Sequence, residues 1–138
     1  MSLFIASDHA GFLLKEELKK QFDLIDLGTH STDSCDYPIF AEKLIRNLGQ
    51  NDKGVLICGT GIGMSIAANR CKNIHAALCF NEEMAKLSRQ HNDANVIIFG
   101  ARIISADVAI KCLKTFLSTD FEGGRHLRRI EKTDQISC

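Results

Sequence analysis

The sequence predicts an α/β fold, a three-layer α/β/α sandwich in which helices cover both faces of a five-stranded parallel sheet. Two observations predict it. Short apolar runs alternate with segments of helical periodicity along the whole chain. These runs hold few polar residues, which is typical of strands buried on both faces of a sheet. The chain has 138 residues and neither a repeat nor a linker, so we expect a single domain over residues 1–138.

The first half of the chain supplies two strands and two helices. Apolar runs at residues 3–6 and 24–27 predict the strands. Apolar residues at four-residue spacing from position 14 to position 22 predict a helix between them. A second helix is predicted to begin at residues 37–38, where a proline fits the first turn.

The second half supplies three strands and the remaining helices. The strands are predicted at residues 55–58, 75–79 and 95–99. A helix is expected over residues 61–70, and two more are expected to begin at Asn81 and Ser105, which are residues that cap helix N-termini. A glycine pair then leads to a basic helical tail at residues 125–132. Such a Rossmann or flavodoxin-like sheet binds ligands beyond the carboxyl ends of its strands.

Composition excludes several classes of partner. Lysine plus arginine and aspartate plus glutamate both number 17, so the formal net charge of zero favours neither nucleic acid nor an anionic membrane as a partner. No apolar run is long enough to span a bilayer. The N-terminus has no basic segment before its short apolar run, so it is a poor signal peptide and we expect a cytoplasmic protein.

The six cysteines form no C-x-x-C pair, which removes the main signal for a zinc ribbon or a thioredoxin-like motif. We expect free thiols in a reducing compartment. Cys71, Cys79 and Cys112 lie in apolar patterns and are expected in the core, while Cys35 and Cys138 have no role that the sequence indicates.

A glycine-rich loop follows the third predicted strand. Its sequence from Cys58 to Ser65 is CGTGIGMS, which matches neither the Walker loop nor a dinucleotide-binding fingerprint. The loop is either a tight turn from strand to helix or a cradle of backbone amides for an anion. Cys58 is either a buried structural cysteine or a thiolate favoured by the helix N-terminus that follows it.

Other polar residues point to a small phosphorylated ligand. His9 follows Asp8 at the end of the first strand, where a polar pair is more often functional than structural. Arg125 and Arg129 are four residues apart, so on a helix they share a face that suits a phosphate, although a solvated basic face is the commoner explanation. His91 ends a polar helix and Arg102 follows the fifth strand. We find no metal-ligand spacing and no cofactor fingerprint, so no cofactor is expected.

Six motifs lie along the chain in a shared order. They are SDHAGF (7–12), DYP (36–38), CGTGIGMSIAANR (58–70), SRQHNDANV (88–96), GAR (100–102) and GGRHLRRI (123–130). With these motifs, essentially the whole chain resembles the RpiB/LacAB family of sugar-phosphate isomerases. The resemblance implies a strand order of 2-1-3-4-5, a homodimer or a tetramer built from two such dimers, and composite active sites. It also implies metal-independent interconversion of ribose 5-phosphate and ribulose 5-phosphate through a cis-enediolate.

The resemblance also assigns roles to particular residues. Cys58 would be the base that moves a proton between C2 and C1, with Thr60 and His91 assisting ring opening. The implied sugar contacts are Asp8, Tyr37 and Asn92, and the implied phosphate grip is His9, Arg125 and Arg129 with help from Arg102. The backbone amides of Gly59, Thr60, Gly61, Ile62 and Gly63 would cradle the enediolate oxygen. Another branch of the family has glutamate at the position of Met64 and glycine at that of Cys58, so this chain resembles the cysteine-base branch.

Two alternatives remain open. One is an isomerase of six-carbon sugar phosphates, allose 6-phosphate or galactose 6-phosphate, because the motifs do not fix the length of the pocket. The other is a sugar-phosphate sensor without catalysis, which would need the glycine loop and the arginines but not Cys58, Thr60 and His91 together.

Overall fold

The computed structural model describes residues 1–138, and every predicted strand and helix is present. The strands are β1 (Leu3–Ser7), β2 (Ile25–Asp26), β3 (Lys53–Cys58), β4 (Ala76–Leu78) and β5 (Val96–Gly100). The helices are α1 (Phe12–Lys19), α2 (Tyr37–Asn47), α3 (Ile62–Ala68), α4 (Glu82–Asn92), α5 (Ala106–Ser118) and α6 (Arg125–Asp134). The predicted caps are confirmed, since Asn81 Oδ1 accepts from the Met84 amide at 2.8 Å and Ser105 Oγ from the Val108 amide at 3.3 Å.

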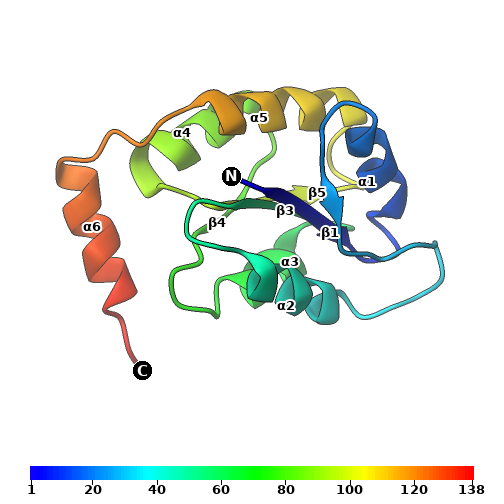
Figure 1. The fold of residues 1–138 in the computed structure, drawn as a ribbon, viewed down its shortest axis with the longest axis horizontal. Coiled ribbons are helices and arrows are strands. Elements are labelled where there is room, and N and C mark those ends of the chain that lie inside the picture. The colour runs from blue at the N-terminus through cyan, green and yellow to red at the C-terminus, as the bar shows by residue number, and fades with distance from the viewer.

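Helices cover both faces of the parallel sheet, as expected (Figure 1). Because successive side chains of a strand point to opposite faces, β3 sends Ile57 toward α1, α4 and α5 and Cys58 toward α2 and α3. The first layer encloses a core of 15 buried residues and the second a core of 9. Cys58 therefore belongs to the smaller core, directly below the loop that begins α3.

The expected order of the strands is wrong at one edge. The observed order is β2-β1-β3-β5-β4, so β5 lies beside β3 and β4 forms the edge, instead of the order 2-1-3-4-5. The physical reason is burial. All five residues of β5 are buried, whereas the three residues of β4 are only partly buried. The more continuous apolar strand takes the interior position, and this brings the end of β5 next to the end of β3.

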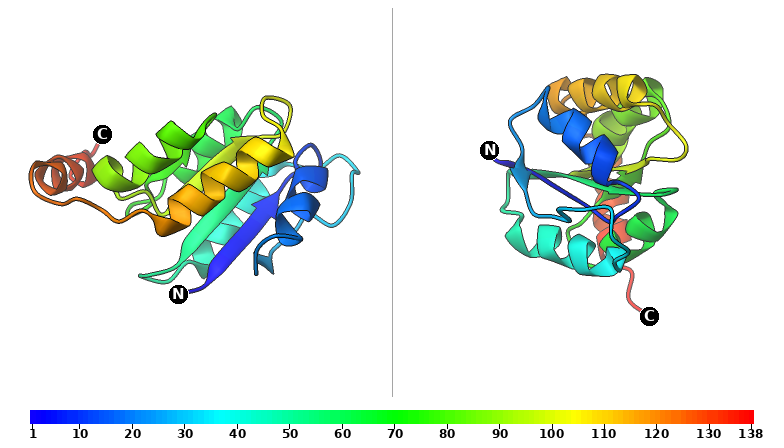
Figure 2. Two further views of the ribbon diagram at one scale, coloured as in Figure 1. Left: turned by 90° about the horizontal axis from the view of Figure 1, so that it is seen from above. Right: turned by 90° about the vertical axis from the view of Figure 1, so that its right-hand side faces the viewer.

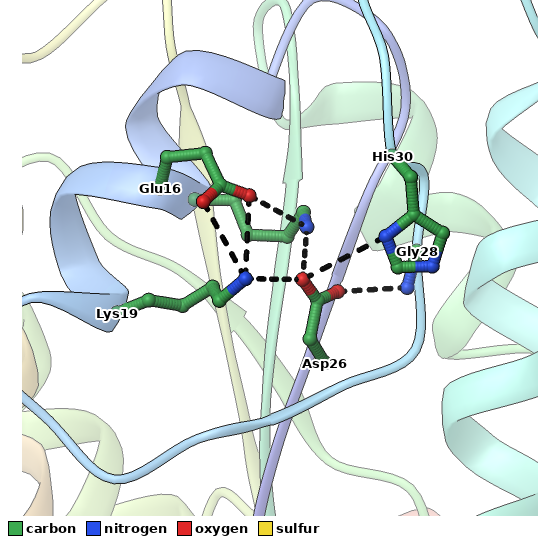
Figure 3. A network of polar contacts seen from close by, with 6 residues as sticks. Glu16, Lys19, Asp26, Gly28 and His30 are labelled. Carbon is green, nitrogen blue, oxygen red and sulfur yellow. Dashed lines mark hydrogen bonds and ion pairs between the residues drawn. The ribbon is translucent and has the colours of Figure 1, made fainter.

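The other edge of the sheet is held by ion pairs between β2 and α1. Lys15 is fully buried, and its Nζ lies 2.5 Å from Asp26 Oδ2. Asp26 also accepts from Lys19 at 2.8 Å and from the Gly28 amide at 2.9 Å (Figure 3). Burial alone would raise the pKa of Asp26, but these hydrogen bonds outweigh it and lower the pKa to about 2. This carboxylate therefore neutralises the buried ammonium of Lys15.

Helix α6 projects from the amino edge of the sheet, away from the direction in which the strands run (Figure 2). None of its residues is buried. A pair between His75 Nε2 and Asp134 Oδ1, 2.7 Å apart, ties the end of the helix to the start of β4. The predicted tail is thus a formed helix that leaves most of its surface uncovered within one chain.

All six cysteines are free thiols, as predicted. Cys79 and Cys112 are buried, and burial raises the pKa of Cys79 to about 12 and that of Cys112 to about 11. Cys71 is exposed, which corrects its expected place in the core, because it lies in the turn after α3 rather than on the buried face of that helix. None of the helices combines the length and the apolar character that a membrane span requires.

Candidate active site

The carboxyl ends of β1 and β3 lie side by side at the topological switch point, where the strand order reverses. Ser7 pairs with Ile57, so Asp8 and Cys58 follow on adjacent strands. Asp8 is buried, and its Oδ1 accepts a hydrogen bond from the Gly11 amide at 3.1 Å. A carboxylate and a thiol are therefore held at the same edge of the sheet, on adjacent strands.

The loop after β3 folds back on the thiol. Gly61 has a left-handed backbone with φ of 80°, a conformation that favours glycine, and its amide donates to Cys58 Sγ at 3.2 Å. Cys58 is 5% exposed. The Ile62 amide donates to Thr60 Oγ1 at 3.2 Å. The sequence thus places a backbone donor on the thiol and leaves the hydroxyl hydrogen of Thr60 free to donate elsewhere.

Three other amides of the loop make no hydrogen bond within the chain, namely those of Gly59, Thr60 and Gly63. They differ in this from the Gly61 and Ile62 amides, which are already engaged. Of the five amides in the predicted cradle, these three are the ones free to stabilise an oxyanion.

Two side chains pack closely over the glycines of the loop. A Cβ at position 63 would lie 2.6 Å from Cζ of Tyr37, and one at position 59 would lie 2.9 Å from Nη1 of Arg102. The Arg102 amide also donates to the Gly59 carbonyl at 2.9 Å, a contact that the interior position of β5 makes possible. Tyr37 and Arg102 therefore border the thiol loop.

His9 lies at the same edge. Its Nδ1 accepts from the Cys35 amide at 3.2 Å, which leaves Nε2 to carry the proton of a neutral ring. The Cys35 thiol is 3.8 Å from the same Nδ1. His9 thus has one nitrogen fixed by the backbone and a second available to donate to a ligand.

Four predicted site residues lie at the opposite edge of the sheet: His91, Asn92, Arg125 and Arg129. His91 and Asn92 end α4 just before β5 begins, whereas Cys58 is paired with the last residue of β5. Four residue steps along β5 separate these edges by about 13 Å. The tail lies with them, since the His126 ring stacks on that of His91 with centroids 4.3 Å apart. A single chain therefore does not bring these four residues to the thiol.

The cavities of the chain agree with a divided site. A cavity of about 320 Å³ is lined by Asn92, His75 and Ile130, and one of about 520 Å³ lies between α2 and α3 beside Tyr37. Cys58 lines neither of them. Near Tyr37, the apolar side chains of Ile39, Ile62 and Ile66 are more than half exposed.

Sequence reasoning missed one feature of the amino edge. His91 Nε2 lies 3.8 Å from Glu122 Oε1, and His126 Nε2 lies 3.6 Å from the same oxygen. Burial lowers the pKa of His126, and neighbouring His91 and Arg125 lower it further. His126 was visible only as one residue of the basic tail, and Glu122 lies 31 positions from His91, so no spacing pattern could join them.

Together, the fold and the carboxyl edge define a doubly wound α/β protein with a thiol, a carboxylate and free amides at its switch point. This arrangement is typical of enzymes that act on small molecules. The sequence matches the Ribose/Galactose Isomerase family over residues 3–133, and the chain belongs to that family.

Similar proteins and solved structures match this chain over almost its full length. Ribose-5-phosphate isomerase B of Escherichia coli is 43% identical over 136 residues, which cover 94% of this chain and 91% of that protein. The structure of a ribose 5-phosphate isomerase from Thermotoga maritima has a TM-score of 0.93 and 49% identity and covers 98% of each chain. The structure of ribose-5-phosphate isomerase B from Mycoplasma genitalium with bound ribulose-5-phosphate has a TM-score of 0.86 and 45% identity, over 97% of this chain and 94% of that one.

Proposed function

We propose that this protein interconverts ribose 5-phosphate and ribulose 5-phosphate. The observation that carries the proposal is the Cys58 thiol, held by the Gly61 amide beside three free loop amides, in a member of the Ribose/Galactose Isomerase family. The names of the similar proteins from Escherichia coli and Thermotoga maritima support ribose 5-phosphate as the substrate.

In the reaction that we propose, Cys58 acts as a thiolate base. It takes the proton from C2 of the open-chain aldose, and the electron pair of that bond forms the C1–C2 double bond of a cis-enediolate. The charge that develops on the C1 oxygen is stabilised by the amides of Gly59, Thr60 and Gly63. The thiol then returns the proton to C1, and the proton of the C2 hydroxyl moves to the C1 oxygen, which yields the ketose. These steps balance without a redox change.

The other side chains prepare the substrate for this proton transfer. Thr60 and His91 move the protons that open the furanose ring, and Asp8 lies beside the sugar. Tyr37 and Asn92 contact the sugar hydroxyls. His9 donates from Nε2 to the phosphate, and Arg125 and Arg129 grip it with Arg102 nearby.

Because His91, Asn92 and the tail arginines lie at the edge away from Cys58, we propose that they act in the site of a second copy. The exposed apolar residues on α2 and α3, and the absence of buried residues in α6, favour a homodimer in which these surfaces cover each other. Pairing of such dimers into tetramers and a cytoplasmic location stay predictions.

The test is an isomerisation assay on the purified protein, with and without EDTA. We expect turnover of ribose 5-phosphate that EDTA does not reduce, that Cys58→Ala abolishes and that Cys71→Ala, a change of an exposed thiol, leaves intact. Wild-type protein that turns over only allose 6-phosphate or galactose 6-phosphate would move the substrate to the six-carbon alternative. Full activity in Cys58→Ala would refute the thiol base.

A further inference from the structure

Three side chains with ligand atoms that suit metal ions meet where α4 ends and α6 begins: His91, Glu122 and His126. Their ligand atoms all lie within 4.8 Å of one another. Two of these distances, from Glu122 Oε1 to the imidazole Nε2 atoms, are 3.6 and 3.8 Å. Two imidazoles and a carboxylate are a ligand set that proteins use for Zn²⁺ and related divalent ions.

We propose that this cluster is a binding site for Zn²⁺, or for another divalent transition ion that prefers imidazole, and that the bound ion inhibits the enzyme by occupying His91. The site itself follows from the geometry alone. The inhibition rests on the role of His91 in the proposed function.

The distances are close to those that a tetrahedral ion needs. With bonds of about 2.0–2.1 Å, neighbouring ligand atoms of Zn²⁺ lie about 3.3 Å apart. The two distances to Glu122 therefore need to shorten by only a few tenths of an ångström. The third needs a larger rotation of the His91 ring, and that side chain is 40% exposed. The fourth position would face solvent, since half of the Glu122 side chain is exposed.

The backbone already holds the three ligands together. The Glu122 amide donates to the Gln90 carbonyl at 3.1 Å. Because His91 follows Gln90 directly, this bond holds Glu122 near His91. The imidazole rings of His91 and His126 are stacked within 12° of parallel, so one ring must turn for both Nε2 lone pairs to point at the same ion. At 3.6 and 3.8 Å the contacts to Glu122 are longer than hydrogen bonds, so an ion would replace none between them.

The charges around the cluster set the kind of binding. Glu122 offsets one charge of the ion, but Arg125 and Arg129 face His126 from its own helix and repel a cation. We therefore expect reversible binding that a chelator removes, and not a permanently held metal. The competing ligand is the thiol of Cys58 at the other edge of the sheet, and the experiment must separate the two.

Binding is measured first, on the full-length protein after dialysis against EDTA. Equilibrium dialysis against Zn²⁺ with elemental analysis is expected to give one ion per chain. Even the loss of a residue that only hydrogen-bonds to a metal ligand typically lowers metal affinity by 10–100-fold. Glu122→Gln and His126→Gln each remove a direct ligand and are expected to weaken binding by at least about tenfold. His30→Gln, a change of an exposed histidine far from the cluster, and Cys58→Ala are expected to bind as the wild type does.

Cobalt distinguishes the ligands directly. Co²⁺ at the cluster gives visible d–d bands without a thiolate-to-cobalt charge-transfer band. No bound ion, binding that survives both cluster variants, or binding that is lost in Cys58→Ala would overturn the site.

Inhibition is measured second. Zn²⁺ is expected to inhibit wild-type isomerisation, EDTA to reverse it, and Glu122→Gln to keep its basal activity while needing about tenfold more Zn²⁺ for the same inhibition. Zn²⁺ bound at the cluster without any loss of activity would overturn the inhibition. A wild-type protein without isomerase activity would refute the proposed function, and the dialysis would still decide the metal site.

Discussion

Two inactive variants should restore each other if the active site is shared between chains. Cys58→Ala removes the proposed base at the carboxyl edge, and Arg129→Ala removes a proposed phosphate contact on α6 at the amino edge. The two edges are about 13 Å apart along β5, which is too far for one chain to supply both groups to one substrate. In a mixed dimer, one site carries both substitutions and the other carries neither.

The magnitude follows from symmetry. Random exchange of equal amounts of the two variants gives about one half mixed dimers, each with one intact site, so the mixture should regain about one quarter of wild-type activity. The assay is ribose 5-phosphate turnover after the two proteins are co-expressed or unfolded and refolded together. As a matched control, Cys58→Ala mixed with Asp8→Ala should stay inactive, because both residues lie at the same edge. A refolded Cys58→Ala and Arg129→Ala mixture no more active than its parents would refute the shared site.

Three further outcomes are expected. Asp26→Asn leaves the fully buried Lys15 ammonium with only its longer contact to Glu16 Oε1, at 3.4 Å, so urea unfolding should show a loss of about 3 kcal/mol. In the folded wild type the pKa of Asp26 is about 2, against a usual value of about 3.9. The stabilisation from this carboxylate is therefore fully present above about pH 3.9 and is lost as the pH falls through about 2. Acid titration followed by circular dichroism would record this loss. Gly63→Ala drives a methyl group against the ring of Tyr37. KM should therefore rise, and this increase, expressed as a free energy, should exceed the loss in the free energy of unfolding. Cys79, whose pKa is about 12, should resist alkylation by iodoacetamide at neutral pH until the protein is unfolded.

The elements of this fold are predictable from sequence because local signals agree with one another. The caps at Asn81 and Ser105 and the apolar runs of β1, β3 and β5 fix where helices and strands begin. The position of β4 depends on a comparison between strands, because its Ala-Ala-Leu core is less apolar than Val-Ile-Ile-Phe of β5. The strand order that the resemblance implied was therefore wrong at the one edge where two strands compete for the same neighbour.

The candidate site divides in the same way. The groups around Cys58 follow strands and turns that are contiguous in sequence, so motifs identify them one by one. The cluster of His91, Glu122 and His126 depends on where the segment after α5 turns back along α4, and a motif carries no information on that path. A motif also does not say whether a residue acts in its own chain or, as proposed, in a second copy.

The tail has a consequence for how binding and turnover depend on the partner. Within one chain, α6 buries no residue and is tied down mainly by the His75–Asp134 pair and the stacked imidazoles. The proposed phosphate contacts are thus built on a helix with little support within the chain, while the Cys58 thiol belongs to the buried core beside the sheet. In the proposed homodimer the second copy would supply most of the order of α6. Dilution that separates the copies would then remove the proposed phosphate contacts and His91 together but leave the thiol loop folded. Activity should consequently be lost at protein concentrations at which the circular dichroism spectrum of the sheet is still that of the folded chain.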